Sequence, residues 1–256
     1  MEWLFTDLSS WTLIALFLTA FVAGLIDALA GGGGLITVPV LIASGVSPVE
    51  ALATNKLQGC AGTLSASYHF VKTKQVILST LYLPITMTAL GSLAGTTLVS
   101  YLDSNILIKA VPTILIAVAV FFYVLPTIQP AIAKFVRISM THFSFLAGFT
   151  IGFYDGLIGP GTGAFFSTAF ICLMGFSVVA ATAHTKVLNA TSNVSSLILF
   201  SFTGHVLWGV GILMGIGSWL GAQIGSRLVI SKGAKLIRPL VIIMCTALSA
   251  KLIFTG

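Results

Sequence analysis

Two lysines lie inside strongly apolar stretches of the sequence, where a charged side chain needs a cavity or a counterion. Lys56 and Lys186 each come about eight residues into an expected helix, which places them ~12 Å along it at about 1.5 Å per residue. A charge near the middle of a bilayer costs upwards of about 2.5 kcal/mol. The lysines therefore predict a buried anion site, with Asn55 and Thr185, one position earlier, as neutral donors. Snorkelling or a structural ion pair is the alternative interpretation.

Two glycine-rich stretches supply a second, independent signal for anion binding. Glycine in a helix interior costs about 1 kcal/mol relative to alanine, so a run of glycines ends or breaks a helix. A break inside lipid survives only where protein or a water-filled cavity satisfies the freed backbone groups. Helices that begin after such breaks aim N–H groups and a positive dipole end at an anion. The residues expected to bind substrate here are Gly31, Gly32, Gly33, Gly34, Gly159, Pro160, Gly161 and Thr162.

A carboxylate precedes each glycine stretch by one helical turn. Asp27 and Asp155 can pair with the lysines and neutralise the empty site, or they can bind a cation or carry a coupling proton. His184, two residues before Lys186, is a further candidate for proton transfer because histidine titrates near neutral pH. The alternative for His184 is a hydrogen-bonded packing role.

The composition determines the class of protein. Of 256 residues, 57% are hydrophobic and 7% charged, against roughly 25% charged in soluble domains. The sequence therefore predicts an all-α integral membrane protein with about eight to ten transmembrane segments. Glu2 and Asp7 replace the basic start of a cleaved signal, so the first apolar run is expected to stay as a helix. Scattered cysteines and histidines predict no disulfide, metal or cofactor, and the net charge of +6 is expected to set topology rather than to bind nucleic acid.

The elements that must position these residues follow from the apolar runs. The stretch after the first glycines is only about ten residues long, too short to cross ~30 Å as a helix. Together with the preceding run it predicts a broken or re-entrant hairpin. The expected elements are Trp11–Ala30, the short helix Leu35–Ser44, the spans Pro48–Phe70, Val76–Tyr101 and Asn105–Leu125, and the connector Gln129–Met140.

The same pattern recurs later in the chain, at separations of 126 to 130 residues. This recurrence predicts an internal duplication: a first repeat over 1–128, a cytoplasmic connector over 129–140 and a second repeat over 141–256. Basic residues cluster at Lys72–Lys74, Lys134–Arg137 and Arg227–Arg238, which predicts that these loops are cytoplasmic. Each repeat then crosses the membrane an odd number of times. The two repeats are expected to be inverted, with both termini periplasmic.

These motifs resemble the sulfite exporter TauE/SafE family, also called the 4-toluene sulfonate uptake permease family. The likeness covers nearly the whole chain. The stretches that carry it are Gly24–Asp27, Gly31–Pro39, Ala53–Lys56 and, more weakly, Gly156–Gly163 with His184–Lys186. The resemblance implies a permease of the bacterial inner membrane for sulfur-containing anions such as sulfite or organosulfonates, driven by an ion gradient. Pro160 and Thr162 stand where the first repeat has glycines, which leaves open an asymmetric site with the second repeat binding and the first gating.

The sequence thus favours a secondary transporter that moves a small anion by alternating access, with the lipid bilayer and the substrate as its partners and a homo-oligomer left open. A cation or proton-coupled transporter that uses Asp27 and Asp155 is the alternative. A membrane-embedded enzyme is disfavoured, because the sequence contains no recognisable nucleophile motif or ATP-binding loop.

Overall fold

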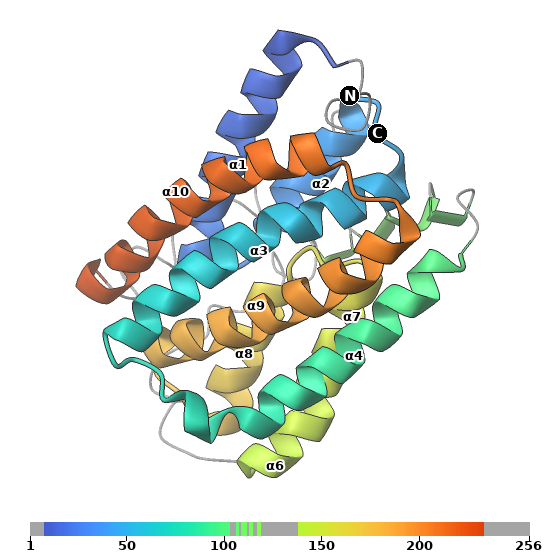
Figure 1. Ribbon diagram of the computed structural model, residues 1–256. Coiled ribbons are helices and arrows are strands. Elements are labelled where there is room, and N and C mark those ends of the chain that lie inside the picture. The colour runs from blue at the N-terminus through green and yellow to red at the C-terminus, as the bar shows by residue number, and fades with distance from the viewer. Residues whose placement is uncertain are drawn as a thin grey trace.

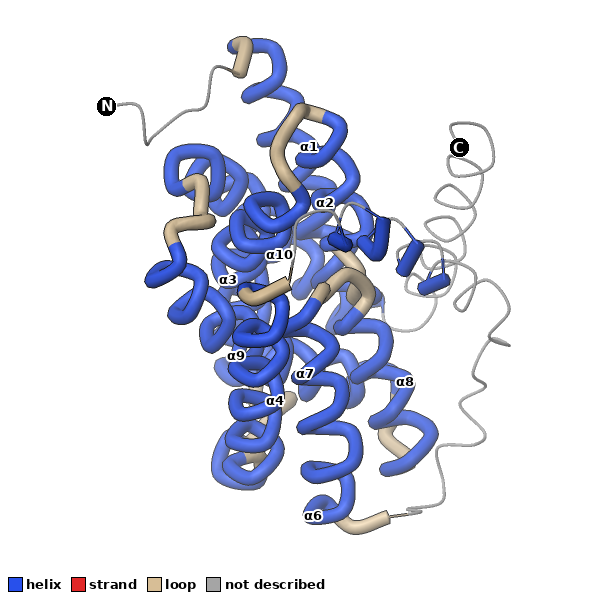
Figure 2. Tube along the Cα trace, turned by 90° about the vertical axis from the view of Figure 1, so that its right-hand side faces the viewer, coloured by secondary structure: helices blue, strands red, loops and turns tan. Residues whose placement is uncertain are grey.

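All regular structure in the described residues is helical (Figures 1 and 2). The computed structural model describes residues 8–102 and 138–232, together with some positions between 106 and 118. The predicted all-α class is therefore confirmed for this part of the chain. Most of the predicted span Asn105–Leu125, and the connector up to residue 137, lie outside the described residues.

The described helices follow the predicted order. They are α1 (Ser10–Ala30), α2 (Gly34–Ala43), α3 (Pro48–Lys72), the 3-10 turn η1 (Leu78–Thr80), α4 (Tyr82–Ser100), α6 (Met140–Phe143), the π-helical turn η3 (Ser144–Gly148), α7 (Phe149–Leu157), α8 (Thr162–Met174), α9 (Val178–Thr203) and α10 (Trp208–Lys232).

Local capping explains where the two lysine-bearing helices begin. Ser47 caps α3 through a capping box with Glu50, and Pro48 occupies the first helical turn, where its missing N–H has no intrahelical partner to lose. Ser177 caps α9 by accepting the N–H of Ala180. The predicted span from Val76 begins later than expected, because the η1 turn precedes α4.

The glycine stretches do end helices. Gly31 closes α1 with φ 77°, and its N–H donates to the carbonyl of Asp27. Gly161 precedes α8 with φ 90°. Both φ values lie in the region that glycine adopts without strain. The helices that follow the breaks have only 10 and 13 residues, so neither can cross a bilayer alone.

Close backbone contacts at glycines join helices from distant parts of the chain. A Cβ at Gly91 or Gly95 of α4 would collide with the backbone of Phe149 or Phe153 in α7. The same holds for Gly217, Gly221 and Gly225 of α10, which meet the backbone of α1 at Phe17, Phe21 and Leu25 in turn. These contacts advance in the same direction along both partners, so α4 and α7 run parallel, and α1 and α10 run parallel. Small residues allow such close approach of helix backbones in membranes.

The packing divides six of the described helices into two groups. One group holds α1, α3 and α10, and the other holds α4, α7 and α9. Figure 1 shows α10 lying beside α3, and α9 lying between α3 and α4. Contacts between α3 and α9 join the two groups.

Two described helices satisfy both the length and the hydropathy expected of a membrane span. These are α1, with mean hydropathy 2.3, and α4, with mean hydropathy 1.3. The longer helices α3 and α9 are more polar because they carry buried polar side chains, among them Asn55, Lys56, Lys186 and Asn189. Exposed apolar side chains cover the outside of α1 and α10, which suits a surface in contact with lipid.

Candidate functional site

The two buried lysines form ion pairs with the two aspartates, and each pair crosses between distant parts of the chain. The Nζ atom of Lys56 in α3 lies 2.9 Å from Oδ1 of Asp155 in α7. The Nζ atom of Lys186 in α9 lies 2.9 Å from Oδ2 of Asp27 in α1. Both pairs are formed between the two helix groups. The sequence left open whether the aspartates neutralise the lysines, and the structure pairs them.

The two aspartates differ in their remaining partners. Asp27 also accepts the N–H groups of Gly32 and Gly33, at 3.0 and 3.2 Å, and its side chain is 18% exposed. The Asp155 side chain is 3% exposed and accepts the hydroxyl of Thr162 at 2.8 Å. Its second oxygen, Oδ2, has no hydrogen-bond partner among the described residues. Lys56 additionally donates to the backbone carbonyl of Asp155. The Asp155 pair is therefore the more enclosed of the two.

The two glycine breaks lie against each other at the centre of the molecule. A Cβ at Gly34 would come within 3.2 Å of Pro160, and one at Gly163 within 2.7 Å of Gly31. The starts of the short helices α2 and α8 therefore meet at one place. The positive ends of both helix dipoles are directed toward this region.

Asn55 and Thr185 fix the short helices to the long ones by equivalent bonds. Thr37 in α2 donates to Oδ1 of Asn55 at 2.6 Å, and Ser167 in α8 donates to the hydroxyl of Thr185 at 3.2 Å. The hydroxyl of Tyr154 donates to the carbonyl of Pro160 at 2.6 Å and holds the second break in place. These residues position the breaks, and only Asn55 among them also lines the cavity.

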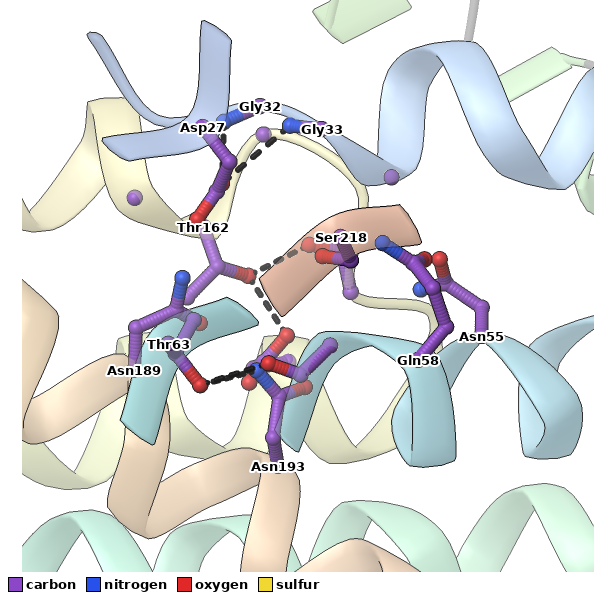
Figure 3. A pocket seen from close by; sticks show the side chains of 16 residues that line it. Asp27, Gly32, Gly33, Asn55, Gln58, Thr63, Thr162, Asn189, Asn193 and Ser218 are labelled. Atoms are coloured by element: carbon purple, nitrogen blue, oxygen red, sulfur yellow. Dashed lines mark hydrogen bonds between the residues drawn. The ribbon is translucent and has the colours of Figure 1, made fainter. Parts of the chain in front are cut away.

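A small polar cavity lies between the breaks and the long helices. Its volume is about 30 Å³, far below the roughly 300–1,000 Å³ of pockets that bind small molecules. Figure 3 shows side chains from α1, α3, α9 and α10 gathered around it. The lining residues are Asp27, Gly32, Gly33, Gly34, Asn55, Gln58, Gly59, Thr63, Asp155, Gly159, Gly161, Thr162, Gly163, Asn189, Asn193 and Ser218.

The cavity wall differs from the predicted site in two respects. Lys56 and Lys186 pair with the aspartates and, like the predicted residues Gly31, Pro160 and Thr185, are not among the lining residues. Gln58, Asn189, Asn193 and the α10 residue Ser218 line the cavity without having been predicted individually. A spacing of four residues carried the missed signal, because Asn55, Gly59 and Thr63 share one helix face, as do Thr185, Asn189 and Asn193.

His184 does not line this cavity. Its Nδ1 atom bonds to the carbonyl of Ala180 at 2.7 Å, and its ring packs against Phe170 and Phe176, with ring centroids 5.6 and 4.8 Å away. These contacts support the packing role that the sequence gave as an alternative, and proton transfer at His184 stays a prediction.

The described residues contain no group of three or more potential metal ligands from histidine, cysteine, aspartate and glutamate. Cys60 and Cys172 are free thiols, and Cys245 lies outside the described residues.

Paired helix breaks that meet at a buried, charge-balanced polar cavity are typical of membrane transporters. The chain belongs to the sulfite exporter TauE/SafE family, whose model matches residues 16–252. It is 46% identical over 239 residues to the probable membrane transporter protein YfcA of Escherichia coli, covering 93% of this chain and 88% of that protein.

Two further relatives carry similar names. A probable membrane transporter protein of Sinorhizobium is 43% identical over 247 residues, covering 96% of this chain and 94% of the relative. One of Haemophilus influenzae is 43% identical over 242 residues, covering 94% of each chain. No solved structure gives a significant match. The family and the names of the relatives indicate a membrane transporter rather than an enzyme.

Proposed function

We propose that the protein is a secondary-active transporter for small sulfur-containing anions such as sulfite or organosulfonates. It would act by alternating access in a bacterial inner membrane, with both termini periplasmic. The observation that carries this proposal is the pair of crossed ion pairs at two facing helix breaks. The family description names sulfite, which supports the choice of substrate class.

The electrostatics of the site suit an anion that replaces a carboxylate. Two lysines and two aspartates leave the closed site without net charge. An anion can enter beside the Asp27 carboxylate, or after this carboxylate has been protonated. It can then replace the carboxylate as the partner of Lys186 and of the N–H groups of Gly32 and Gly33. Because the Asp27 pair is the more exposed, we assign the exchange to this pair.

Alternating access also requires the cavity to widen. Pockets that hold small molecules measure roughly 300–1,000 Å³, so a cavity of about 30 Å³ shows that the described conformation is closed around its site. We propose that the group of α1, α3 and α10 moves against the group of α4, α7 and α9. Both ion pairs and the cavity lie at the boundary between these groups, where movement changes access to the site.

Inverted repeats are part of the proposal, and the direction of two matched helices supports them. Thr54 in α3 accepts the N–H of Leu207, in the turn between α9 and α10, whereas Thr63 further along α3 accepts a hydrogen bond from Asn193. Residue numbers therefore increase along α3 in the direction in which they decrease along α9, so these two helices run antiparallel. Equivalent helices that run in opposite directions are expected of inverted repeats.

A cation site is the second candidate function, because one buried oxygen favours it. Oδ2 of Asp155 lacks a hydrogen-bond partner among the described residues, and Asp155 lines the cavity beside the hydroxyl of Thr162 and the amide of Asn193. Carboxylate, hydroxyl and amide oxygens are suitable ligands for a small hard cation. This site would serve either a transported cation or a coupling ion.

The test is radiolabelled sulfite flux in proteoliposomes. We compare the unmodified protein with Lys186→Gln/Asp27→Asn, in which both charges of one pair are removed together so that no buried charge is left alone. If Lys186 binds the anion, flux falls at least tenfold while the protein stays folded. If flux is unchanged, the lysine has only a structural role.

The cation candidate predicts a different result. Asp155→Asn/Lys56→Gln would then abolish the dependence of flux on a sodium or proton gradient. Anion transport without a cation site predicts that this dependence stays unchanged in the same variant.

A further inference from the structure

A second and much larger cavity lies on the outer side of α3 and α10. Its volume is about 570 Å³, against about 30 Å³ for the central cavity. No residue lines both cavities. Ser218 faces the centre, whereas its neighbour Trp219 lines the outer cavity, and likewise Gly59 and Thr63 face inward while Ala61, Leu64 and Ser65 face outward. The outer pocket is defined by Ala61, Leu64, Ser65, Tyr68, His69, Lys72, Trp219, Gln223, Ser226 and Arg227.

One end of the outer pocket is basic. Lys72, Arg227 and His69 line it, and its described lining contains no carboxylate. Of the described acidic residues, Asp27 and Asp155 face the central cavity, and Glu50 lies at the opposite end of α3. Neither Lys72 nor Arg227 takes part in an ion pair with a described residue. The pocket therefore holds cationic side chains that pair with no carboxylate of the described residues.

The helix directions explain why these charges meet. A Cβ at Gly211 would contact Leu57, one at Gly215 would contact Ala61, and Ser65 lies beside Trp219. Residue numbers increase in the same direction along α3 and α10, so these two helices run parallel (Figure 1). The C-terminal turns of both helices, with Lys72 and Arg227, consequently lie at the same end. The basic loops predicted to be cytoplasmic follow these same turns.

The other end of the outer pocket is apolar and continues onto the exposed surface. Leu64 and Trp219 are 50% and 45% exposed. Ile216 and Ile224 extend the apolar surface along α10. Tyr68 lies near the basic end, where its ring sits 5.8 Å below the Lys72 ammonium. Tyrosine and tryptophan are enriched where a membrane protein crosses the bilayer–water interface.

We propose that this pocket binds an anionic phospholipid. The phosphate would be held by Lys72 and Arg227, with hydroxyls of Ser65 and Ser226 within the same lining, and an acyl chain would lie along Leu64 and the exposed face of α10. Basic pockets between transmembrane helices on the cytoplasmic side are suited to anionic headgroups. The inference concerns a site separate from the transport site and does not depend on the transported substrate.

A second copy of the chain is a less suitable occupant. A symmetric dimer brings the same surface of both subunits together. Centred on this pocket, it would place Lys72 and Arg227 of one subunit near those of the other, without a carboxylate in the described lining to offset the repulsion.

The test uses quenching of Trp219 by brominated lipids. Trp3, Trp11 and Trp208 are replaced by phenylalanine, so that Trp219 is the remaining tryptophan. The protein is reconstituted in mixtures of phosphatidylcholine and phosphatidylglycerol, with one or the other lipid brominated. We expect phosphatidylglycerol to bind beside Trp219 about 25-fold more strongly than phosphatidylcholine, about fivefold for each of the two basic side chains.

The basic side chains are then removed. Each is expected to contribute about fivefold to the preference, so Lys72→Gln/Arg227→Gln abolishes it. Lys74→Gln is the matched control, because Lys74 lies two positions further on and is not in the described lining; it keeps the preference. Equal quenching by both lipids in the unmodified protein, or an unchanged preference in the double variant, overturns the proposal.

A second measurement identifies the competing occupant. Light scattering of the protein in detergent gives the oligomeric state with and without the double substitution. A dimer that becomes more stable in Lys72→Gln/Arg227→Gln, as removal of the repulsion predicts, together with no lipid preference in the unmodified protein, assigns the pocket to a second copy and overturns the lipid proposal.

Discussion

The Lys56–Asp155 pair is more enclosed than the Lys186–Asp27 pair, so replacing Lys56 should destabilise the protein more than replacing Lys186. Lys56→Met leaves Asp155 as an unpaired carboxylate in a site where both side chains are at most 3% exposed. Removing one partner of a buried pair costs about 3–5 kcal/mol. Lys186→Met leaves Asp27 with two N–H donors and 18% exposure to water, so we expect a smaller loss of about 1–3 kcal/mol.

These free energies convert to measurable temperatures. For chains of this size about 1 kcal/mol shifts the Tm by roughly 2–4 °C. Lys56→Met should therefore lower the Tm by about 10 °C, and Lys186→Met by about 5 °C. A thiol-reactive dye in detergent is a suitable assay, because Cys60 is buried and reacts once the protein unfolds.

The double variant Lys56→Met/Asp155→Leu is the control for this reasoning. It removes both charges, and Thr162 keeps a hydrogen bond to the carbonyl of Gly159 at 2.6 Å. Replacing a buried pair by apolar side chains is often neutral, so the Tm should return to within a few degrees of the unmodified protein. Equal shifts for the two single variants, or a double variant no more stable than Lys56→Met, would refute the argument from enclosure.

Three further predictions concern packing and the cavity. Gly221→Ala should lower the Tm by several degrees, because the added Cβ meets the backbone of α1. Gly215→Ala on the same helix should be tolerated, because its Cβ meets only the Cβ of Ala61 at 3.4 Å. Equal Tm values for the two variants would contradict this reasoning. Asn193→Leu should reduce sulfite flux at least tenfold with little change in Tm, because Thr63 keeps its bond to Gly59, and unchanged flux would remove Asn193 from the site. His184→Gln should leave the pH profile of flux unchanged, because the ring packs among phenylalanines; an altered profile would restore the coupling role.

The helix breaks and the buried charges could be predicted from sequence because their signals are local. A glycine run inside an apolar stretch ends a helix whatever surrounds it, as Gly31 and Gly161 do. A lysine in an apolar stretch needs a partner wherever it lies, so Lys56 and Lys186 were identified without knowledge of the fold. The span predicted from Pro48 begins where α3 begins.

The pairing and the cavity wall depend on packing and could not be predicted in this way. Either lysine could have paired with the aspartate of its own half, and nothing near Lys56 in the sequence points to Asp155. Ser218 lines the cavity only because α10 packs against α1 and α3. Polar side chains such as Gln58 become informative once the facing helix is known.

The two ion pairs lie between the two helix groups, whereas the close contacts at glycines lie within each group. Backbone contacts at Gly91, Gly95 and Gly221 each join helices from different halves of the sequence within one packing group. Movement of one sequence half against the other would separate these close-packed surfaces, and interdigitated backbones resist sliding. The boundary between the groups instead carries the ion pairs, whose partners an anion or a proton can replace. A ligand shifts a conformational equilibrium only through contacts that differ between the states. Replaceable charges at the boundary between two rigid groups supply such contacts, which is why we place the movement there.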